Sequence, residues 1–191
     1  KIHSDSIDIQ PVSVNDHIRG DVNTAEAIII EYSDLECPFC KNFHKTLQGV
    51  MEKYPGKVAW VYRHFPIDQL HQKARKEAEA SECAASLGGN AKFWEYLDQI
   101  YARTNSNDSL PESELPKIAK DVGLDVKAFN ECLSSGKFAA KVQADYDDAI
   151  KAGGRGTPNS IIVAKDGTKI VVQGAQSYDN IKRTIDALLF Q

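Results

Sequence analysis

Apolar positions along the first third of the chain follow two different periods. Residues 27–33 and 58–65 are nearly continuous apolar runs, typical of strands covered on both faces. Between them, from Pro38 to Tyr54, apolar residues recur at steps of three and four and predict an amphipathic helix. Pro38 suits a first helical position, and a Pro-Gly pair follows Tyr54. Strand, helix and strand in this order predict a βαβ unit with a parallel strand pair.

After residue 66 the apolar period stays near that of a helix until residue 152. Helices are expected over residues 70–87, 91–103, 112–122, 126–133 and 138–152, with Asp125 as an N-cap. The linker 104–111 is polar and is predicted to be the most mobile internal segment. The pattern therefore indicates an all-helical block.

Strand pattern returns at residues 160–164 and 169–173, joined through an Asp-Gly turn, and a last helix is expected over 178–190. The chain thus predicts an α/β fold. A central mixed four-stranded sheet with flanking helices is formed by residues 1–66 and 153–191, and residues 67–152 form an inserted helical subdomain. Within the first part, residues 1–25 are expected only at an edge.

Composition narrows the class of protein. The 191 residues are 42% hydrophobic and 26% charged, as in an ordinary globular domain, and the net charge of -4 argues against nucleic acid or anionic membrane surfaces as partners. No apolar run approaches the ~20 residues that span a bilayer. Because the chain starts at Lys1 without an apolar signal core, we expect a mature or trimmed product whose targeting or anchor segment is absent. Four cysteines beside a single methionine favour an oxidising compartment.

The first buried strand leads directly into Cys37-Pro38-Phe39-Cys40. Two cysteines at this spacing can close a small disulfide, and the first sulfur lies among unpaired backbone N–H groups at the positive end of the helix dipole. A thiolate is favoured there. By itself the motif leaves a redox dithiol, half of a metal site and haem attachment open.

Further sequence strings occur in a fixed order. They are Arg63-His64-Phe65-Pro66-Ile67 with His71 behind it, Lys92-Phe93-Trp94-Glu95-Tyr96, Gly123-Leu124-Asp125, Gly156-Thr157-Pro158 before a strand, and Gly174-Ala175-Gln176 before the last helix. With the dithiol, they resemble the DsbA-like branch of the thioredoxin superfamily. The resemblance implies a thioredoxin fold with a helical insert, and a redox-active disulfide in place of any cofactor or metal.

The resemblance also assigns roles to individual residues. Cys37 is the exposed nucleophile and Cys40 the buried resolving thiol, an order that the helix start supports independently. Thr157-Pro158 resembles the cis-proline loop, whose backbone would bind an extended substrate peptide; an ordinary trans proline is the alternative. Glu31 matches a buried acid that relays the proton of Cys40, so a pKa raised towards neutrality is expected; a salt-bridged or edge-exposed glutamate is the alternative.

The surroundings of the dithiol bear on its strength as an oxidant. Phe39 stands where the best-known relatives carry His, and it offers no N–H, so a milder oxidant is expected. Alternatively, backbone donors and the possible modulators His64 or His71 compensate, although these two histidines also suit packing or hydrogen-bonding roles. Asp34 and Glu36 are expected to crowd the entrance and to oppose a thiolate.

The other two cysteines, Cys83 and Cys132, fall on two helices of the insert, where some relatives carry a second disulfide. A structural bridge is therefore predicted, with two buried unpaired thiols as the alternative. These cysteines do not form a second Cys-X-X-Cys, so they give no support for a metal site.

These features predict a thiol:disulfide oxidoreductase that donates the Cys37–Cys40 disulfide to unfolded or reduced exported polypeptides. A monomer in the periplasm or cell envelope, served by a membrane-bound redox partner, is expected. Two alternatives stay open. One is a reductase or isomerase kept reduced by a partner, and the other is a non-catalytic metal-binding or chaperone-like module.

Overall fold

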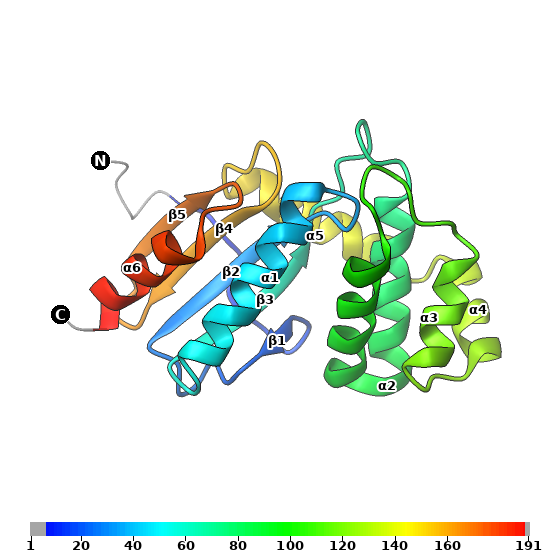
Figure 1. Ribbon diagram of the computed structural model, residues 1–191, viewed down its shortest axis with the longest axis horizontal. Coiled ribbons are helices and arrows are strands. Elements are labelled where there is room, and N and C mark those ends of the chain that lie inside the picture. The colour runs from blue at the N-terminus through cyan, green and yellow to red at the C-terminus, as the bar shows by residue number, and fades with distance from the viewer. Residues whose placement is uncertain (1–6, 190–191) are drawn as a thin grey trace.

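The computed structural model describes residues 7–189 and contains a mixed five-stranded sheet with helices on both faces (Figure 1). The strands are β1 (His17–Arg19), β2 (Ala27–Ser33), β3 (Val58–His64), β4 (Asn159–Ala164) and β5 (Lys169–Gln173), in the order β1-β3-β2-β4-β5. β2 and β3 are parallel and are joined by α1 (Pro38–Lys53), whereas β1, β4 and β5 pair antiparallel to their neighbours. The predicted βαβ unit and the four central strands are confirmed. β1 adds a fifth, edge strand, too short for its alternation to stand out in the sequence.

The two faces of the sheet are covered by different helices. α1 and α6 (Tyr178–Leu189) pack on one face, and α5 (Ala139–Lys151) packs on the other. Along β2, Ile29 belongs to the core on the α1 side, and Ile30 and Tyr32 belong to the core on the α5 side. Because side chains alternate along a strand, Glu31 and Ser33 face α1. The predicted last residue of the final helix, Phe190, lies outside the described residues.

The helical lobe contains α2 (Ala74–Arg103), α3 (Glu114–Asp121) and α4 (Val126–Ser135), seen at the right of Figure 1. α2 joins two predicted helices across a kink at Gly89, whose φ of 78° is readily adopted only by glycine. The cap prediction at Asp125 is confirmed, because its carboxylate accepts a 2.7 Å hydrogen bond from the backbone N–H of Ala128. Cys83 on α2 and Cys132 on α4 form a disulfide with Cα atoms 5.9 Å apart.

The lobe and the sheet share one apolar core on the α1 side of the sheet. It runs from Trp60 on β3 through Phe93 on α2 to Phe129 on α4. α5, which the sequence groups with the insert, packs against β2 and β3 as well as against α2. The division into residues 1–66 with 153–191 and residues 67–152 stays a prediction, and α5 is the element that contacts both parts. No helix within residues 7–189 combines the length and the apolar character needed to cross a membrane.

Candidate active site

The dithiol lies where β2 ends and α1 begins. Cys37 is the N-cap residue of α1, Pro38 is the first helical residue, and Cys40 lies within the first turn, as the sequence predicts. Both sulfurs are free thiols, and Cys37 Sγ lies 3.6 Å from the carbonyl oxygen of Thr157. Cys40 is fully buried, but Cys37 is only 5% exposed, so the expectation of an openly exposed nucleophile is wrong. The reason is the segment around Thr157, which lies against the Cys37 sulfur.

The two thiols have opposite electrostatic surroundings. A hydrogen bond from the Cys40 thiol lowers the pKa of Cys37 to about 6. Burial opposes this shift, and hydrogen bonds from Thr157 and from the backbone of Cys40 and Phe39 add to it. Burial, together with the neighbouring Cys37 sulfur, raises the pKa of Cys40 well above its ordinary value. At neutral pH, Cys37 is therefore mostly a thiolate and Cys40 a thiol. Phe39 contributes a backbone donor, while its side chain is 63% exposed.

Glu31 is completely buried in the central strand β2. Its Oε2 accepts a 2.9 Å hydrogen bond from Trp60 Nε1, and within residues 7–189 its Oε1 has no hydrogen-bond partner. Burial raises the pKa of Glu31 to about 7, against the hydrogen bonds of Ser33 and Trp60. The carboxyl group is thus placed to gain and lose a proton near neutral pH. β3 and β4 flank β2 on both sides, so the residue is not at a sheet edge.

Asp34 does not crowd the entrance as expected, because its carboxylate points into the protein. It accepts hydrogen bonds from the backbone N–H groups of Ile67 (2.7 Å) and Glu36 (2.8 Å), and it lies 2.9 Å from His71 Nδ1. Burial by itself lowers the pKa of His71, but the hydrogen bond and charge of Asp34, followed by the charge of Cys37, raise it overall. Of the two predicted modulators, His71 is the one whose pKa the neighbouring Cys37 affects.

Glu36 is also turned inward and is fully buried. Its carboxylate accepts hydrogen bonds from Thr104 Oγ1 (2.8 Å) and from the backbone N–H of Ser109 (3.2 Å), and its carbonyl oxygen accepts one from Asn107 (2.7 Å). The segment 104–111, predicted from its polar composition to be the most mobile, is instead held against the start of α1 by these bonds. Thr104 and Ser106 are buried in this segment, whereas the neighbouring Asn105, Asn107 and Ser109 are exposed to solvent.

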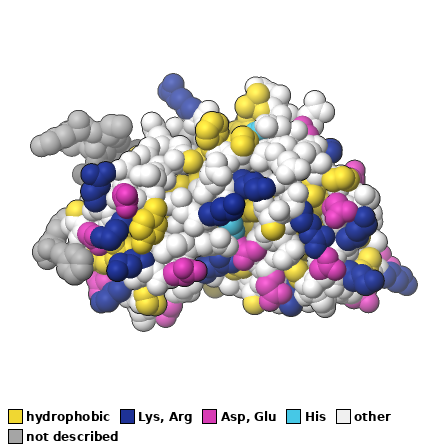
Figure 2. Space-filling view, viewed as in Figure 1, with side chains coloured by type: hydrophobic (Ala, Val, Ile, Leu, Met, Phe, Trp, Pro, Cys, Tyr) yellow, Lys and Arg dark blue, Asp and Glu magenta, His cyan; other side chains and the backbone are white. Residues whose placement is uncertain are grey.

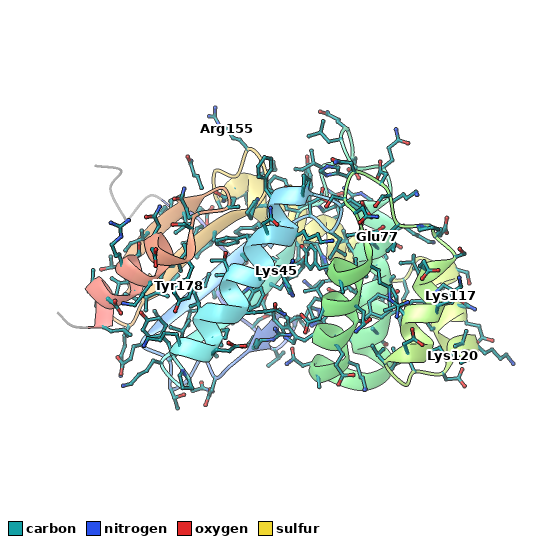
Figure 3. The ribbon with its side chains drawn as sticks, viewed as in Figure 1. Lys45, Glu77, Lys117, Lys120, Arg155 and Tyr178 are labelled. Atoms are coloured by element: carbon teal, nitrogen blue, oxygen red, sulfur yellow. A yellow bond between two sulfur atoms is a disulfide. The ribbon has the colours of Figure 1, made fainter. Side chains whose placement is uncertain are left out.

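Glu77 on α2 is a second buried acid in this region, and sequence reasoning did not single it out (Figure 3). Its side chain is 2% exposed, and its Oε2 has no hydrogen-bond partner in the described part of the chain. Burial raises the pKa of Glu77 to about 9, with further contributions from the charge and the hydrogen bond of Glu36. Glu77 is therefore a neutral acid at pH 7.

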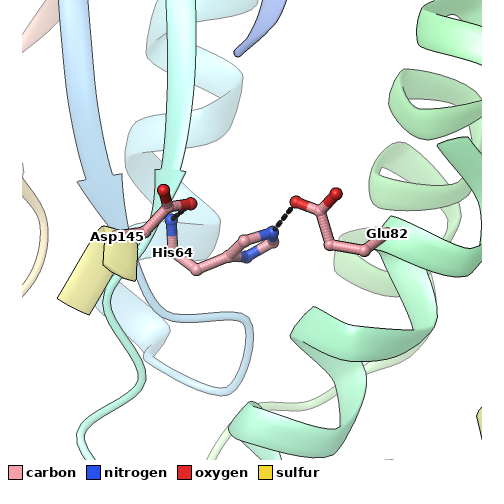
Figure 4. A group of neighbouring side chains, drawn as sticks. All are labelled: His64, Glu82 and Asp145. Carbon is pink, nitrogen blue, oxygen red and sulfur yellow. Dashed lines mark hydrogen bonds and ion pairs between the residues drawn. The ribbon is translucent and has the colours of Figure 1, made fainter. Parts of the chain in front are cut away.

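His64 lies in a different cluster, which joins β1, β3, α2 and α5. Figure 4 shows His64 with Glu82 of α2 and Asp145 of α5. Its Nε2 and the Nε2 of His17 each lie 2.9 Å from the same oxygen of Glu82, and its backbone N–H donates to Asp145 at 3.1 Å. Within residues 7–189, only one group of three or more His, Cys, Asp or Glu side chains is close enough together to hold a metal ion, and it consists of His64, Glu82 and Asp145. Because these side chains already bind one another or the backbone, the cluster links the helical lobe to the sheet through hydrogen bonds.

The surface around Cys37 combines a groove with apolar side chains. The Thr157–Pro158 peptide bond is cis, and these two residues line a groove of about 330 Å³ that extends to Gly174. Arg155 projects into solvent at its rim (Figure 3). Hydrophobic side chains gather above the start of α1 (Figure 2), and Leu70 is among the exposed large hydrophobic residues of the protein. A peptide reaching Cys37 therefore meets both apolar groups and backbone.

The fold and the site define a thioredoxin-fold protein with a Cys-X-X-Cys dithiol. The family model described as thioredoxin matches residues 13–187. The chain belongs to this family.

Solved structures of DsbA-like proteins resemble the chain over nearly its full length. DsbA2 of Pseudomonas aeruginosa is 29% identical, with a TM-score of 0.79 over 94% of this chain and 97% of that one. The alpha-DsbA1 of Wolbachia pipientis is 29% identical, with a TM-score of 0.76 over 93% and 92%. BdbD of Bacillus subtilis, at 21% identity and a TM-score of 0.82 over 97% and 99%, shares the fold. The predicted DsbA-like thioredoxin fold is confirmed.

The curated relatives are much longer proteins. Na(+)/H(+) antiporter NhaA 3 of Salinispora tropica is 33% identical over 77% of this chain and 21% of its own length. Na(+)/H(+) antiporter NhaA of Herminiimonas arsenicoxydans is 30% identical over 91% of this chain and 25% of its own length. The chain thus spans about a fifth to a quarter of these relatives.

Proposed function

We propose that the protein is a thiol:disulfide oxidoreductase that donates a Cys37–Cys40 disulfide to reduced or unfolded exported polypeptides. The observation that carries the proposal is the contrast between the two thiols: Cys37 is stabilised as a thiolate at the start of α1, and Cys40 is held buried and protonated. A sulfur that is stable as a thiolate is a good leaving group, and a disulfide that contains it is readily attacked. The likeness to DsbA2 of Pseudomonas aeruginosa supports thiol–disulfide exchange as the general chemistry.

The exchange takes place in two displacements. A substrate thiolate attacks the Cys37 sulfur, the Cys37–Cys40 bond breaks, and Cys40 leaves with the electron pair and takes up a proton. A second substrate thiolate then attacks the substrate sulfur of the mixed disulfide, and Cys37 leaves as a thiolate. The substrate loses two electrons, and the dithiol gains them. Glu31 exchanges the proton of Cys40, and a protonated His71 would favour the Cys37 thiolate.

Substrate binding is assigned to the groove beside the dithiol. An extended peptide placed along Thr157 and Pro158 would use backbone hydrogen bonds, which do not depend on sequence. The exposed rings and chains of Phe39 and Leu70 would contact apolar residues, which unfolded polypeptides expose. This combination suits many substrates rather than one.

The strength of the oxidant follows from the Cys37 pKa of about 6. This value lies between those of thioredoxin (~7) and DsbA (~3.5). At pH 7, a Cys37 pKa one unit below that of the thioredoxin cysteine stabilises the reduced dithiol by about 1 kcal/mol more than in thioredoxin. The redox potential is then raised by about 20 mV above thioredoxin's ~-270 mV. The protein is thus a mild oxidant. A measured redox potential discriminates between this disulfide donor and the alternative, a reductase or isomerase kept reduced by a partner.

The remaining assignments follow from this chemistry. A disulfide donor needs an oxidising location, so we place the protein outside the cytoplasm, in the periplasm or cell envelope, as a monomer that a membrane-bound redox partner reoxidises. The Cys83–Cys132 disulfide supports such a location. A metal-binding module has less support, because the one cluster of suitable side chains in residues 7–189 lacks both cysteines of the motif.

Two measurements test the proposal. Equilibration with a glutathione series should give a dithiol potential above that of thioredoxin, whereas a value at or below it would contradict disulfide donation. Cys37→Ser should abolish disulfide donation to a reduced dithiol peptide. As a matched variant, reduced Cys40→Ser should instead trap a mixed disulfide with an oxidised peptide. Donation retained by Cys37→Ser would remove Cys37 as the nucleophile, and one zinc ion per chain would favour the metal-binding alternative.

A further inference from the structure

The buried sulfur of Cys40 accepts a hydrogen bond from the backbone. The N–H of Asp34, the first residue after β2, lies 3.4 Å from Cys40 Sγ. The carbonyl oxygen of the same peptide unit belongs to Ser33, and it accepts a 2.8 Å hydrogen bond from the N–H of Phe65. Because the C=O and N–H of a planar trans peptide unit point in opposite directions, the bond from Phe65 turns the Asp34 N–H towards the sulfur.

The side chain of Asp34 fixes the position of this N–H. One carboxylate oxygen accepts from the N–H of Glu36 at 2.8 Å, and the other accepts from the N–H of Ile67 at 2.7 Å and lies 2.9 Å from His71 Nδ1. The carbonyl oxygen of Asp34 accepts from the N–H of Cys37 at 3.2 Å. Asp34 is 1% exposed, so water does not compete for these bonds. The turn from β2 to α1 is therefore held together by the residue that also contacts Cys40.

The titratable groups around Cys40 come from four elements, and each of them is either neutral or negatively charged. They are Cys37 of α1, Glu31 of β2, Tyr62 of β3, and Tyr101 of α2, whose hydroxyl donates to the Asp34 carbonyl oxygen at 3.4 Å. Lys41 and His44, the nearest basic residues along α1, are bound to the Thr104 carbonyl oxygen and to Asp98. In such surroundings a fixed N–H dipole stabilises a negative charge on the sulfur.

We propose that the backbone N–H of Asp34 stabilises the Cys40 sulfur as it becomes a thiolate, and that the carboxylate of Asp34 positions this N–H. This inference rests on the proposed function. When a substrate thiolate attacks the Cys37 sulfur, a new S–S bond forms, the Cys37–Cys40 bond breaks, and Cys40 leaves with the electron pair. The Asp34 N–H then donates to the charged sulfur until the sulfur takes up a proton.

The same contact acts in the opposite direction. Cys40 gives up its proton to Glu31, and its thiolate, held by the Asp34 N–H, attacks the Cys37 sulfur of a mixed disulfide. The Cys37–Cys40 bond forms, and the departing thiol leaves with the electron pair of the broken S–S bond.

Reaction of the reduced protein with oxidised glutathione measures this contribution. Cys37 attacks in a second-order step, and at high concentrations of oxidised glutathione the attack by Cys40 on the mixed disulfide limits the rate. Acid quenching and mass spectrometry follow the mixed disulfide at each pH. We expect Asp34→Ala to raise the pH at which the Cys40 step levels off by about one unit, because a hydrogen bond to the thiolate is lost.

The two pH profiles should cross. At pH 7 Asp34→Ala should be about threefold slower than wild type, because fewer Cys40 sulfurs are ionised and the more basic thiolate is a better nucleophile. At a pH where Cys40 is a thiolate in both proteins, the variant should be about threefold faster. Damage to the site without a change at the Cys40 sulfur would slow the step at every pH.

Companion variants separate the N–H from the charges around it. His71→Asn removes the imidazole but not the two backbone bonds of the Asp34 carboxylate, so the Cys40 step should keep its pH profile. Asp34→Asn keeps a side-chain oxygen that can accept a backbone N–H, and it should restore most of the wild-type rate. Asp145→Ala is the matched control, because Asp145 is also buried and accepts a backbone N–H, that of His64.

A spectroscopic test reports on the N–H directly and decides the question if Asp34→Ala does not fold. In Cys37→Ser, ionisation of Cys40 should shift the Asp34 amide proton downfield, with the same pH midpoint as the Cβ signal of Cys40. Two results would overturn the inference: an Asp34→Ala profile that does not cross that of wild type, or an Asp34 amide signal that ignores the ionisation of Cys40. A wild-type protein that forms no mixed disulfide would overturn the proposed function instead.

Discussion

Replacing Glu77 with Gln tests whether the protein holds a carboxylic acid that stays protonated at neutral pH. Glu77 is almost completely buried and lies beside Glu36, whose carboxylate binds the segment 104–111. Gln has nearly the same shape and keeps a donor for Glu36, but it cannot ionise. We therefore expect Glu77→Gln to be more stable than the wild-type protein at neutral and alkaline pH.

The magnitude follows from the difference between the folded and unfolded pKa values of Glu77. The pKa is 4.5 in an ordinary environment and about 9 in the folded protein. As pH rises above 4.5, the unfolded state releases this proton and the folded state keeps it, so the unfolded state binds fewer protons. The free energy of unfolding then falls by about 1.4 kcal/mol per pH unit until the folded group ionises as well, which costs about 3 kcal/mol at pH 7. Glu77→Gln removes this loss.

Urea unfolding at pH 5 and pH 8 measures the effect. The difference in free energy of unfolding between Glu77→Gln and wild type should be small at pH 5 and several times larger at pH 8, and other titrating groups cancel in this comparison. Glu95→Gln, at a half-exposed position on the same helix, is the control and should shift stability little at either pH. A variant that is less stable than wild type at pH 8 would show that Glu77 is ionised and paired, against this reasoning.

Two further variants test the dithiol and the Glu82 cluster that links the helical lobe to the sheet. Phe39→His should make the dithiol more oxidising, by up to about 70 mV if the added N–H brings the Cys37 pKa to the ~3.5 of DsbA; an unchanged potential in a glutathione series would refute the role given to this position. Glu82→Gln should lower the free energy of unfolding by roughly 3 kcal/mol at pH 7, because His17 and His64 lose the carboxylate between them. Burial raises the pKa of Glu82, but the hydrogen bonds and charges of these two histidines outweigh burial and hold the pKa below 4.5. The difference in free energy of unfolding between variant and wild type should therefore fade in urea titrations below pH 4.5. A variant as stable as wild type at pH 7 would contradict this prediction.

Features that a local pattern encodes could be predicted from the sequence. The strands Ala27–Ser33 and Lys169–Gln173 have the predicted bounds, because each apolar run is closed by polar residues or glycine. Asp125 caps α4 through a contact three residues away. Glu31 stood out because a charged residue interrupts an apolar run, and its complete burial follows from the position of β2 at the centre of the sheet.

Features that depend on contacts between distant segments could not be predicted. Glu82 meets His17, which lies 65 residues earlier in the chain, and nothing in the local pattern of either residue marks the contact. Glu77 reads as an ordinary charged helix residue. A signal was present in its spacing, because Ala74 and Ser81 lie one turn away on either side and both are buried. The small residues on that face of α2 allow close packing, which removes Glu77 from water.

The same contacts change the view of how the dithiol is controlled. In the sequence, Asp34 and Glu36 are two negative charges beside Cys37, and they would oppose a thiolate. In the structure Asp34 is bound to His71, and Glu36 binds the segment 104–111, so both charges are committed to internal partners. The thiolate is then stabilised by Cys40, Thr157 and backbone N–H groups, all fixed by the fold. Because its side chain is 63% exposed, Phe39 is the position beside the sulfur that can change without disturbing the core, and the potential can be tuned there independently of stability.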